Sequence, residues 1–261
     1  MPHHESFFLK LARAEHHIDT LHSAIDSFLK QDPYSFVRHA NLDRTEYVWI
    51  AKGSAQLPDD WSIIIGDAIH NLRSCLDHLA FAIARNRMRL KDRTNVQFPI
   101  DDAPRVGGFV KATNGCLPGV PKKARTIIEG LQPYSRINVG PHPLTVLREW
   151  SNADKHRALH PAWGIIGGGN VISPVLPVEW EIIEPIFEDQ TEVFRARFDA
   201  PDVDVQFQPR IEIVVPIAIP TTPKATTFLV NVLPIESLRG ILAFIRHQAI
   251  PPLEPFVRPI E

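Results

Sequence analysis

The sequence predicts an α+β protein. Its N-terminal helical region is built on a long antiparallel helix pair, and its C-terminal antiparallel β-meander is closed by a helix. Two observations carry this prediction. Apolar residues recur with the helical period in residues 5–30 and 60–90, and apolar and polar residues alternate with the strand period after residue 170. We divide the chain into a helical region, residues 1–162, and a sheet with a last helix, residues 163–261, packed together as one compact unit.

Residues 5–30 are expected to form the first long helix. Asp32-Pro33 ends it, because the residue before a proline is driven out of the helical region. Its apolar residues recur at steps of four and three, and this heptad seam must face another helix. The seam consists of Phe7, Leu11, Ala14, Ile18, Leu21, Ile25 and Phe28.

A second helix is expected over residues 60–90, where Pro58-Asp59-Asp60 is a typical start signal. It repeats the heptad step, and two long helices with matching seams pack most simply as an antiparallel pair. Its seam consists of Ile65, Ile69, Leu72, Leu76, Leu79 and Ile83. Between the helices, residues 45–52 are dense in β-branched and aromatic side chains and predict a short strand.

Shorter elements follow. Residues 94–120 are rich in proline and glycine and predict a loop. Further helices are expected from Pro121 to Gly130 or Pro133, over residues 143–160, and over residues 235–248 before a proline-rich tail. After a glycine-rich segment, alternation predicts strands within 171–172, 180–183, 191–198, 204–207, 210–215 and 226–232.

Composition limits the classes of protein that fit. The chain contains no apolar run of the roughly 18 residues that a membrane helix needs, and its two cysteines are typical of a reducing compartment. We therefore expect a cytoplasmic protein without a membrane segment. Net charge is −2, but residues 85–125 carry ten Lys or Arg against three Asp. Such a positive segment attracts phosphates, although it is also typical of a solvated surface.

The outer face of the second helix is unusual. His70, Ser74 and His78 form a stripe opposite the apolar seam, where a helix normally carries Lys and Glu. Asp67, Asn71 and Asp77 flank this stripe. Arg73 lies four residues before Asp77, so the two are expected to form an ion pair along the same helix.

A second polar group follows about eighty residues later, in Asp154-Lys155-His156-Arg157. Asp154 is in phase with Leu144 and Leu147, on the side of its helix that is expected to be buried. A buried carboxylate is costly unless it meets a cation or hydrogen-bond donors. Arg73, His70 or His78 would supply them, so we predict that the two segments face each other.

Arg73-Ser74-Cys75-Leu76-Asp77-His78 matches the Arg-x4-His pattern of the HEPN superfamily, which this helix resembles. HEPN proteins are small helical bundles of toxin–antitoxin, abortive-infection and CRISPR-associated systems, and many are metal-independent ribonucleases that act as dimers. The resemblance implies that Arg73 contacts the scissile phosphate and that His78 moves a proton at the 2′-hydroxyl or at the leaving oxygen. It also implies RNA as a partner and a homodimer as the assembly.

A second resemblance covers much of residues 45–160. Gly66-Asp67-x2-His70-Asn71-Leu72-Arg73-x2-Leu76-Asp77-His78-Leu79, together with Asp154-Lys155-His156-Arg157, is similar to a group of uncharacterised bacterial proteins. This second resemblance implies no function.

The resemblance implies a HEPN-like protein that binds RNA or another phosphate-bearing ligand, and it leaves cleavage of RNA open. The catalytic candidates are Arg73 and His78. The supporting candidates are His70, Asn71, Ser74, Asp77, Asp154 and His156. The substrate-binding candidates are Arg85, Arg87, Arg89, Lys155 and Arg157. No cofactor and no metal ligand is assigned.

Two other classes stay open. The polar side chains could form a structural network that fixes the helix register in a non-catalytic interaction or scaffold protein. His70, His78 and His156 could instead hold a metal in a helical hydrolase, because histidine is a common metal ligand. A Ser74–His78–Asp154 triad is not favoured, because Ser74 lies in mid-helix without the exposed turn that presents a nucleophile.

Overall fold

The structure is a computed structural model that describes residues 5–31, 33–52, 57–87, 94–135, 141–156, 162–183, 189–220 and 227–257. For residues 156, 162–165, 168, 216–220 and 227–232 it describes the backbone alone. Helices and antiparallel sheets are both present, which confirms the α+β class. No described helix is long and apolar enough to cross a membrane.

The chain forms two compact units, each built from separate segments. One, the helical unit, comprises Met1–Leu21, Ser62–Leu159 and Ile217–Glu261. The other, the sheet unit, comprises His22–Trp61 and His160–Pro216. The chain therefore crosses between the units several times, whereas a single division after residue 162 was expected.

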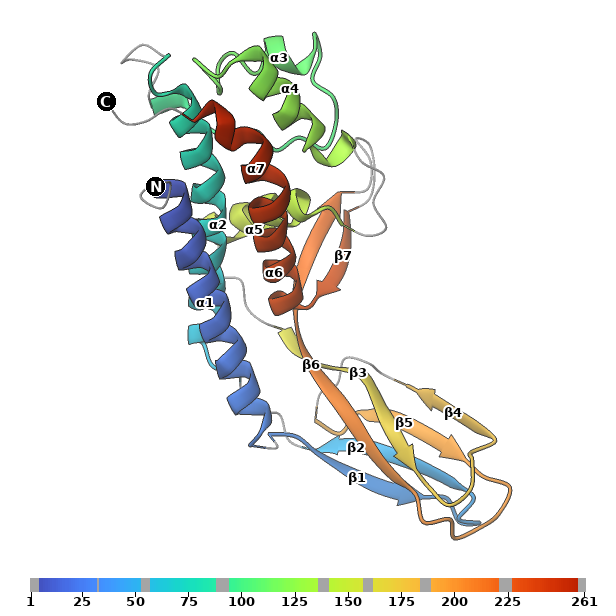
Figure 1. Ribbon diagram of the computed structural model, residues 1–261. Coiled ribbons are helices and arrows are strands. Elements are labelled where there is room, and N and C mark those ends of the chain that lie inside the picture. Colours follow the sequence, from blue (N-terminus) through green and yellow to red (C-terminus); the bar gives the residue numbers. More distant parts are fainter. Residues whose placement is uncertain are drawn as a thin grey trace. The chain divides into compact units, whose positions relative to one another are not determined.

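The long helix pair is antiparallel, as the matching seams predicted (Figure 1). It consists of α1, Ser6–Leu29, and α2, Asp60–Ala84. Arg85, directly after α2, donates two hydrogen bonds of 2.7 and 2.9 Å to the carboxylate of Glu5, directly before α1. The seam residues of both helices in the helical unit are buried. The helix α2 ends at Ala84, six residues earlier than expected, and residues 85–87 form a turn.

Further helices complete the helical unit. They are α3 (Phe109–Ala112), α4 (Lys122–Gly130), η2 (Pro133–Ser135), α5 (Pro143–His156), α6 (Pro234–Phe244), η3 (Ile245–Ala249), α7 (Ile250–Leu253) and η4 (Glu254–Phe256). The helix expected over residues 235–248 corresponds to α6 and the π-helical turn η3. The proline-rich tail expected after it is partly helical, because its first prolines occupy first-turn positions of α7, which need no backbone N–H. Arg246 ties this last segment to α1 through a hydrogen-bonded ion pair of 2.8 Å with Glu15.

The strands form two antiparallel sheets. The strands are β1 (Ser35–Ala40), β2 (Glu46–Lys52), β3 (Ala162–Ile172), β4 (Glu179–Ile182), β5 (Glu192–Arg197), β6 (Gln206–Pro220) and β7 (Thr227–Val232). Their orders are β1-β2-β5-β4 and β3-β6-β7. The glycine-rich segment lies inside β3, and the two strands expected within 204–215 are one long strand, β6. The hairpin β1–β2 extends the sheet of the later strands β5 and β4, a pairing that local alternation does not predict.

Aromatic residues fill the core of the sheet unit. Phe194 of β5 stacks on Phe207 of β6 with ring centroids 4.1 Å apart, and these strands belong to different sheets. Trp49 of β2 lies 5.4 Å from Phe194 and 5.9 Å from Phe207. The core therefore lies between the two sheets and gives this unit an apolar interior of its own.

Candidate functional site

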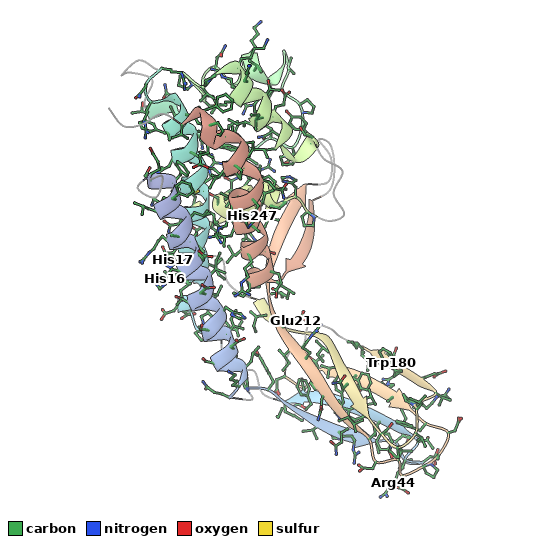
Figure 2. All side chains as sticks on the ribbon, in the orientation of Figure 1. His16, His17, Arg44, Trp180, Glu212 and His247 are labelled. Carbon is green, nitrogen blue, oxygen red and sulfur yellow. The ribbon has the colours of Figure 1, made fainter. Side chains whose placement is uncertain are left out.

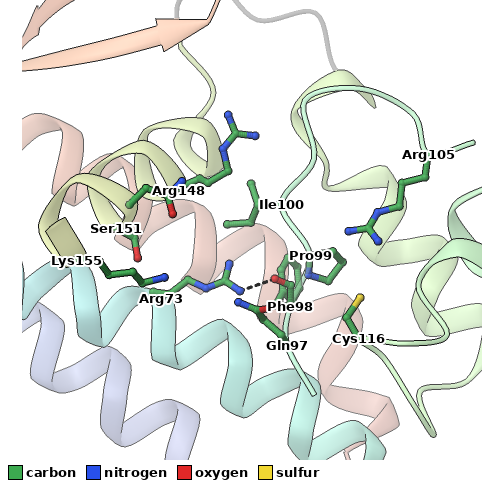
Figure 3. A pocket seen from close by; sticks show the side chains of 11 residues that line it. Arg73, Gln97, Phe98, Pro99, Ile100, Arg105, Cys116, Arg148, Ser151 and Lys155 are labelled. Atoms are coloured by element: carbon green, nitrogen blue, oxygen red, sulfur yellow. Dashed lines mark hydrogen bonds between the residues drawn. The ribbon is translucent and has the colours of Figure 1, made fainter. Parts of the chain in front are cut away.

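A pocket of about 230 Å³ lies in the helical unit between α2, α5 and the segment around residues 97–105 (Figure 3). Each charged side chain that lines it is a cation. The pocket is lined by Arg73, Gln97, Phe98, Pro99, Ile100, Arg105, Cys116, Arg148, Ser151, Asn152 and Lys155. Because a low-dielectric wall strengthens the field of such side chains, this arrangement favours an anionic ligand.

Arg73 and Asp77 of α2 form hydrogen bonds with the backbone of Phe98, which lines the pocket. The Arg73 Nη2 donates to Asp77 Oδ1 at 2.8 Å and to the carbonyl oxygen of Phe98 at 2.6 Å. The backbone N–H of Phe98 donates to the same Asp77 oxygen at 2.8 Å. The expected pair along the helix is confirmed, and it also pins residue 98 to α2. Burial raises the pKa of Asp77, and the neighbouring guanidinium of Arg73 opposes this rise.

Two further arginines of the pocket are paired with carboxylates. Arg105 forms two hydrogen bonds with Asp101, of 2.6 and 3.0 Å. Arg148 binds Asp102 and also contacts Glu149 at 2.6 Å. These pairs restrict the arginine rotamers and leave other N–H groups of each fork available, because a guanidinium carries five donors.

Lys155 differs from the arginines. It is exposed on α5, its side chain points toward Arg73 in Figure 3, and it makes no ion pair or hydrogen bond with any residue that the structure describes. Its charge is therefore the least compensated at the pocket. Lys155 is one of the substrate-binding residues that the sequence predicted.

The histidine stripe lies on another side of α2, away from this pocket. Ser74 Oγ and His70 Nε2 share a hydrogen bond of 3.4 Å. Lys10 of α1 donates to Asn71 Oδ1 at 3.3 Å, and the Asn71 amide donates to the carbonyl oxygen of Asp67 at 2.8 Å. The Lys10–Asn71 bond joins the polar face of α2 to α1, and the other two bonds lie within α2.

His78 does not line the pocket either. Its Nδ1 is buried without a hydrogen-bond partner among the described residues. Burial, reinforced by the positive charge of Lys10, lowers the pKa of His78, while Asp77 acts in the opposite direction. The structure thus places Arg73 and His78 in different surroundings rather than at one common ligand.

Asp154 of α5 lies directly against α2, as predicted. A Cβ placed on Gly66 would stand 2.6 Å from Asp154 Oδ1, so the glycine makes room for the carboxyl. Burial and the nearby charge of Asp67 raise the pKa of Asp154, and His70 opposes them. Of the three partners proposed for this carboxyl, His70 is the one whose charge acts on it, whereas Arg73 is engaged with Asp77 and Phe98.

The other candidates are dispersed. Arg85 binds Glu5, and Arg87 donates to the carbonyl oxygens of Ile83 and Phe256. Arg89 and Arg157 lie outside the described residues, and so does the side chain of His156. Within the described ranges, no group of three or more His, Cys, Asp or Glu could hold a metal ion.

Arg105 and Arg148 were missed as candidates. Arg148 could have been found, because Arg148, Asn152 and Lys155 recur at steps of four and three and so share one face of α5. Arg105 offered no such signal, because it lies in an irregular segment whose path depends on tertiary contacts.

No family model, curated protein or solved structure matches this chain.

Proposed function

We propose that the protein binds a phosphate-bearing ligand in the pocket between α2 and α5, and that this ligand is RNA. The observation that carries the proposal is that the charged side chains lining the pocket are all cations, with Lys155 unpaired among the described residues. Arginine forks suit phosphate oxygens because they donate two parallel hydrogen bonds, and lysine adds a mobile point charge.

The size of the pocket supports a phosphate group as the bound part. Pockets for drug-sized ligands measure about 300–1,000 Å³, whereas this one measures about 230 Å³. A phosphodiester with part of its sugar would fit, and the bases would lie outside. Such contacts position a nucleic acid without reading its sequence.

The geometry within one chain supports binding better than cleavage. A ribonuclease built on Arg73 and His78 needs both side chains at one phosphate, but the pocket is lined by Arg73 and not by His78. None of the histidines whose side chains the structure describes lines the pocket. In the expected homodimer, a histidine of the second copy could supply the proton transfer.

The test is fluorescence anisotropy with a labelled single-stranded RNA of about ten nucleotides at low salt. Lys155→Ala is expected to weaken binding about tenfold, because one phosphate contact is lost. Lys123→Ala is the matched control: Lys123 is also exposed but lies on α4 and does not line the pocket. The proposal is wrong if the wild type does not bind, or if both variants bind as it does.

A further inference from the structure

The strand β4 forms an open edge of the sheet unit. It is the outermost strand in the order β1-β2-β5-β4, and within the described ranges no strand pairs with its other side. Trp180 lies at this edge (Figure 2), and 62% of its surface is exposed. Folded proteins normally protect such an edge, because its unpaired backbone groups recruit further strands.

An apolar run leads into this edge. Large apolar side chains are exposed throughout residues 172–180, with Leu176 at 93%. They are Ile172, Val175, Leu176, Val178 and Trp180. So many exposed large apolar side chains within nine residues favour an interaction site at this edge.

One face of the sheet carries rows of alternating charge. In the first row, Glu46 of β2, Arg197 of β5 and Glu179 of β4 are register partners, so the signs run negative, positive, negative. In the second row, Arg195 of β5 is opposite Glu181 of β4. The ion pairs follow these rows, with Arg197 to Glu179 at 3.0 Å and Arg195 to Glu181 at 3.5 Å.

Both rows end on an exposed carboxylate at the open edge. Glu179 is 71% exposed and Glu181 is 60% exposed at the side chain. On the opposite face, the corresponding rows are apolar: Tyr47, Ala196 and Trp180 form one, and Trp49, Phe194 and Ile182 form the other. A next strand would complete these rows with positive residues on one face and apolar residues on the other.

We infer that β4 binds an extended peptide segment of a partner protein, which adds to the sheet as a fifth strand and carries Lys or Arg at alternate positions with apolar residues between them. Main-chain hydrogen bonds to β4 supply the affinity, and Glu179, Trp180 and Glu181 supply the specificity. This inference is independent of the phosphate pocket, which lies in the other unit. It also fits the interaction-protein class that the sequence left open.

A second copy of the chain fits this edge less well. In an antiparallel pairing of two β4 strands centred on Trp180, Glu179 of each copy would stand opposite Glu181 of the other. Like charges directly opposite each other destabilise a sheet. A pairing centred on Glu179 places Glu179 opposite the Glu179 of the other copy. A pairing centred on Glu181 does the same for Glu181. The charge pattern therefore favours a basic partner strand over self-association.

The test is a titration of the full chain with a labelled nine-residue peptide of alternating Lys and Val. This peptide is expected to bind saturably. Two control peptides are expected not to bind: one in which Glu replaces Lys, and one in which the same Lys and Val residues are grouped into one block of Lys and one block of Val. Two further peptides, N-methylated at either the odd or the even backbone amides, add a second readout. Strand addition uses only the amides on one side of the peptide, so only one of these two methylation phases should block it. One methylated phase is expected to lose binding and the other to keep it.

Charge variants complete the test. Glu179→Gln combined with Glu181→Gln is expected to weaken binding of the Lys–Val peptide about tenfold. Asp43→Asn combined with Asp199→Asn is the control, since it removes the same charge from exposed positions that lie outside β4. The inference is overturned if the Lys–Val peptide does not bind, if both methylated phases bind like the parent, if the two double variants behave alike, or if the chain dimerises through β4.

Discussion

At the scale of single residues, Asp77 links α2 to the floor of the pocket. The Oδ1 atom of Asp77 accepts two hydrogen bonds, one from Arg73 and one from the backbone N–H of Phe98. The first bond could be predicted from the spacing of four residues on one helix. The second could not, because it joins residues 21 apart in the chain. A residue that sequence reasoning ranked as supporting thus has an evident structural role.

Asp77→Ala is expected to lower the free energy of unfolding by about 2 kcal/mol, because it removes the carboxylate partner of Arg73 and leaves the Phe98 N–H without its acceptor. Asp77→Asn keeps an oxygen at the same place and should cost about half as much. Urea denaturation followed by circular dichroism measures both. Equal stability of wild type and Asp77→Ala would show that this link contributes nothing.

Asp154 predicts a pH dependence. Burial and Asp67 raise the pKa of its carboxyl in the folded protein, so the folded state holds the proton more tightly than the unfolded state. Its contribution to stability therefore falls as pH rises from the ordinary aspartate value of 3.8 through the raised folded value. Asp154→Asn removes this loss and should be more stable than the wild type at pH 7 by about 0.5 kcal/mol, because solvent screens much of the effect.

Thermal or urea unfolding at pH 7 and at pH 3 measures the difference for Asp154→Asn. The advantage of the variant should disappear at pH 3, where the carboxyl is protonated in both states. Asp43→Asn, at an exposed turn position, is the control and should behave as the wild type at both pH values. A variant that is less stable than the wild type at pH 7 would contradict this account of Asp154.

At the scale of elements, the contact between α2 and α5 was predicted from one residue. Asp154 is in phase with the apolar side of α5, and a carboxyl there needs polar surroundings. In the structure Asp154 lies against α2, where Gly66 provides the space and His70 is the neighbour whose charge favours the carboxylate. The strands were harder to predict: β3 runs through a glycine-rich segment, and its pairing with β6 joins residues far apart in the chain.

Gly66 offers a test of this contact. In the wild-type background, Gly66→Ala should destabilise the protein or leave it unchanged, because the new methyl group displaces Asp154 and offsets the gain in helix propensity. In the Asp154→Ala background the same change should stabilise by about 1 kcal/mol, which is the usual preference for alanine over glycine in a helix. A double-mutant cycle with a coupling energy near zero would show that the two residues do not meet.

At the scale of the whole molecule, the helical unit holds the cation-lined pocket between α2 and α5, and the sheet unit holds the open β4 edge. The helices could be predicted from the sequence because the residues of each apolar seam are close together in the chain. The buried seams of α1 and α2 match the prediction. The division into units could not be read, because the hairpin β1–β2 pairs with β5 from a distant part of the chain. The pocket was foreseen only through Arg73 and Lys155, since its other cations meet through tertiary packing.

The proposed binding of a phosphate in the pocket between α2 and α5 depends on ion pairs. The most direct measurement is the dependence of RNA affinity on salt concentration for the wild type and for Lys155→Ala. Each phosphate contact contributes about 0.7 to the slope of log affinity against log salt for a single strand. The slope for Lys155→Ala is expected to be shallower than that for the wild type by about this amount, whereas Lys123→Ala should keep the wild-type slope. Identical slopes for all three proteins would contradict it.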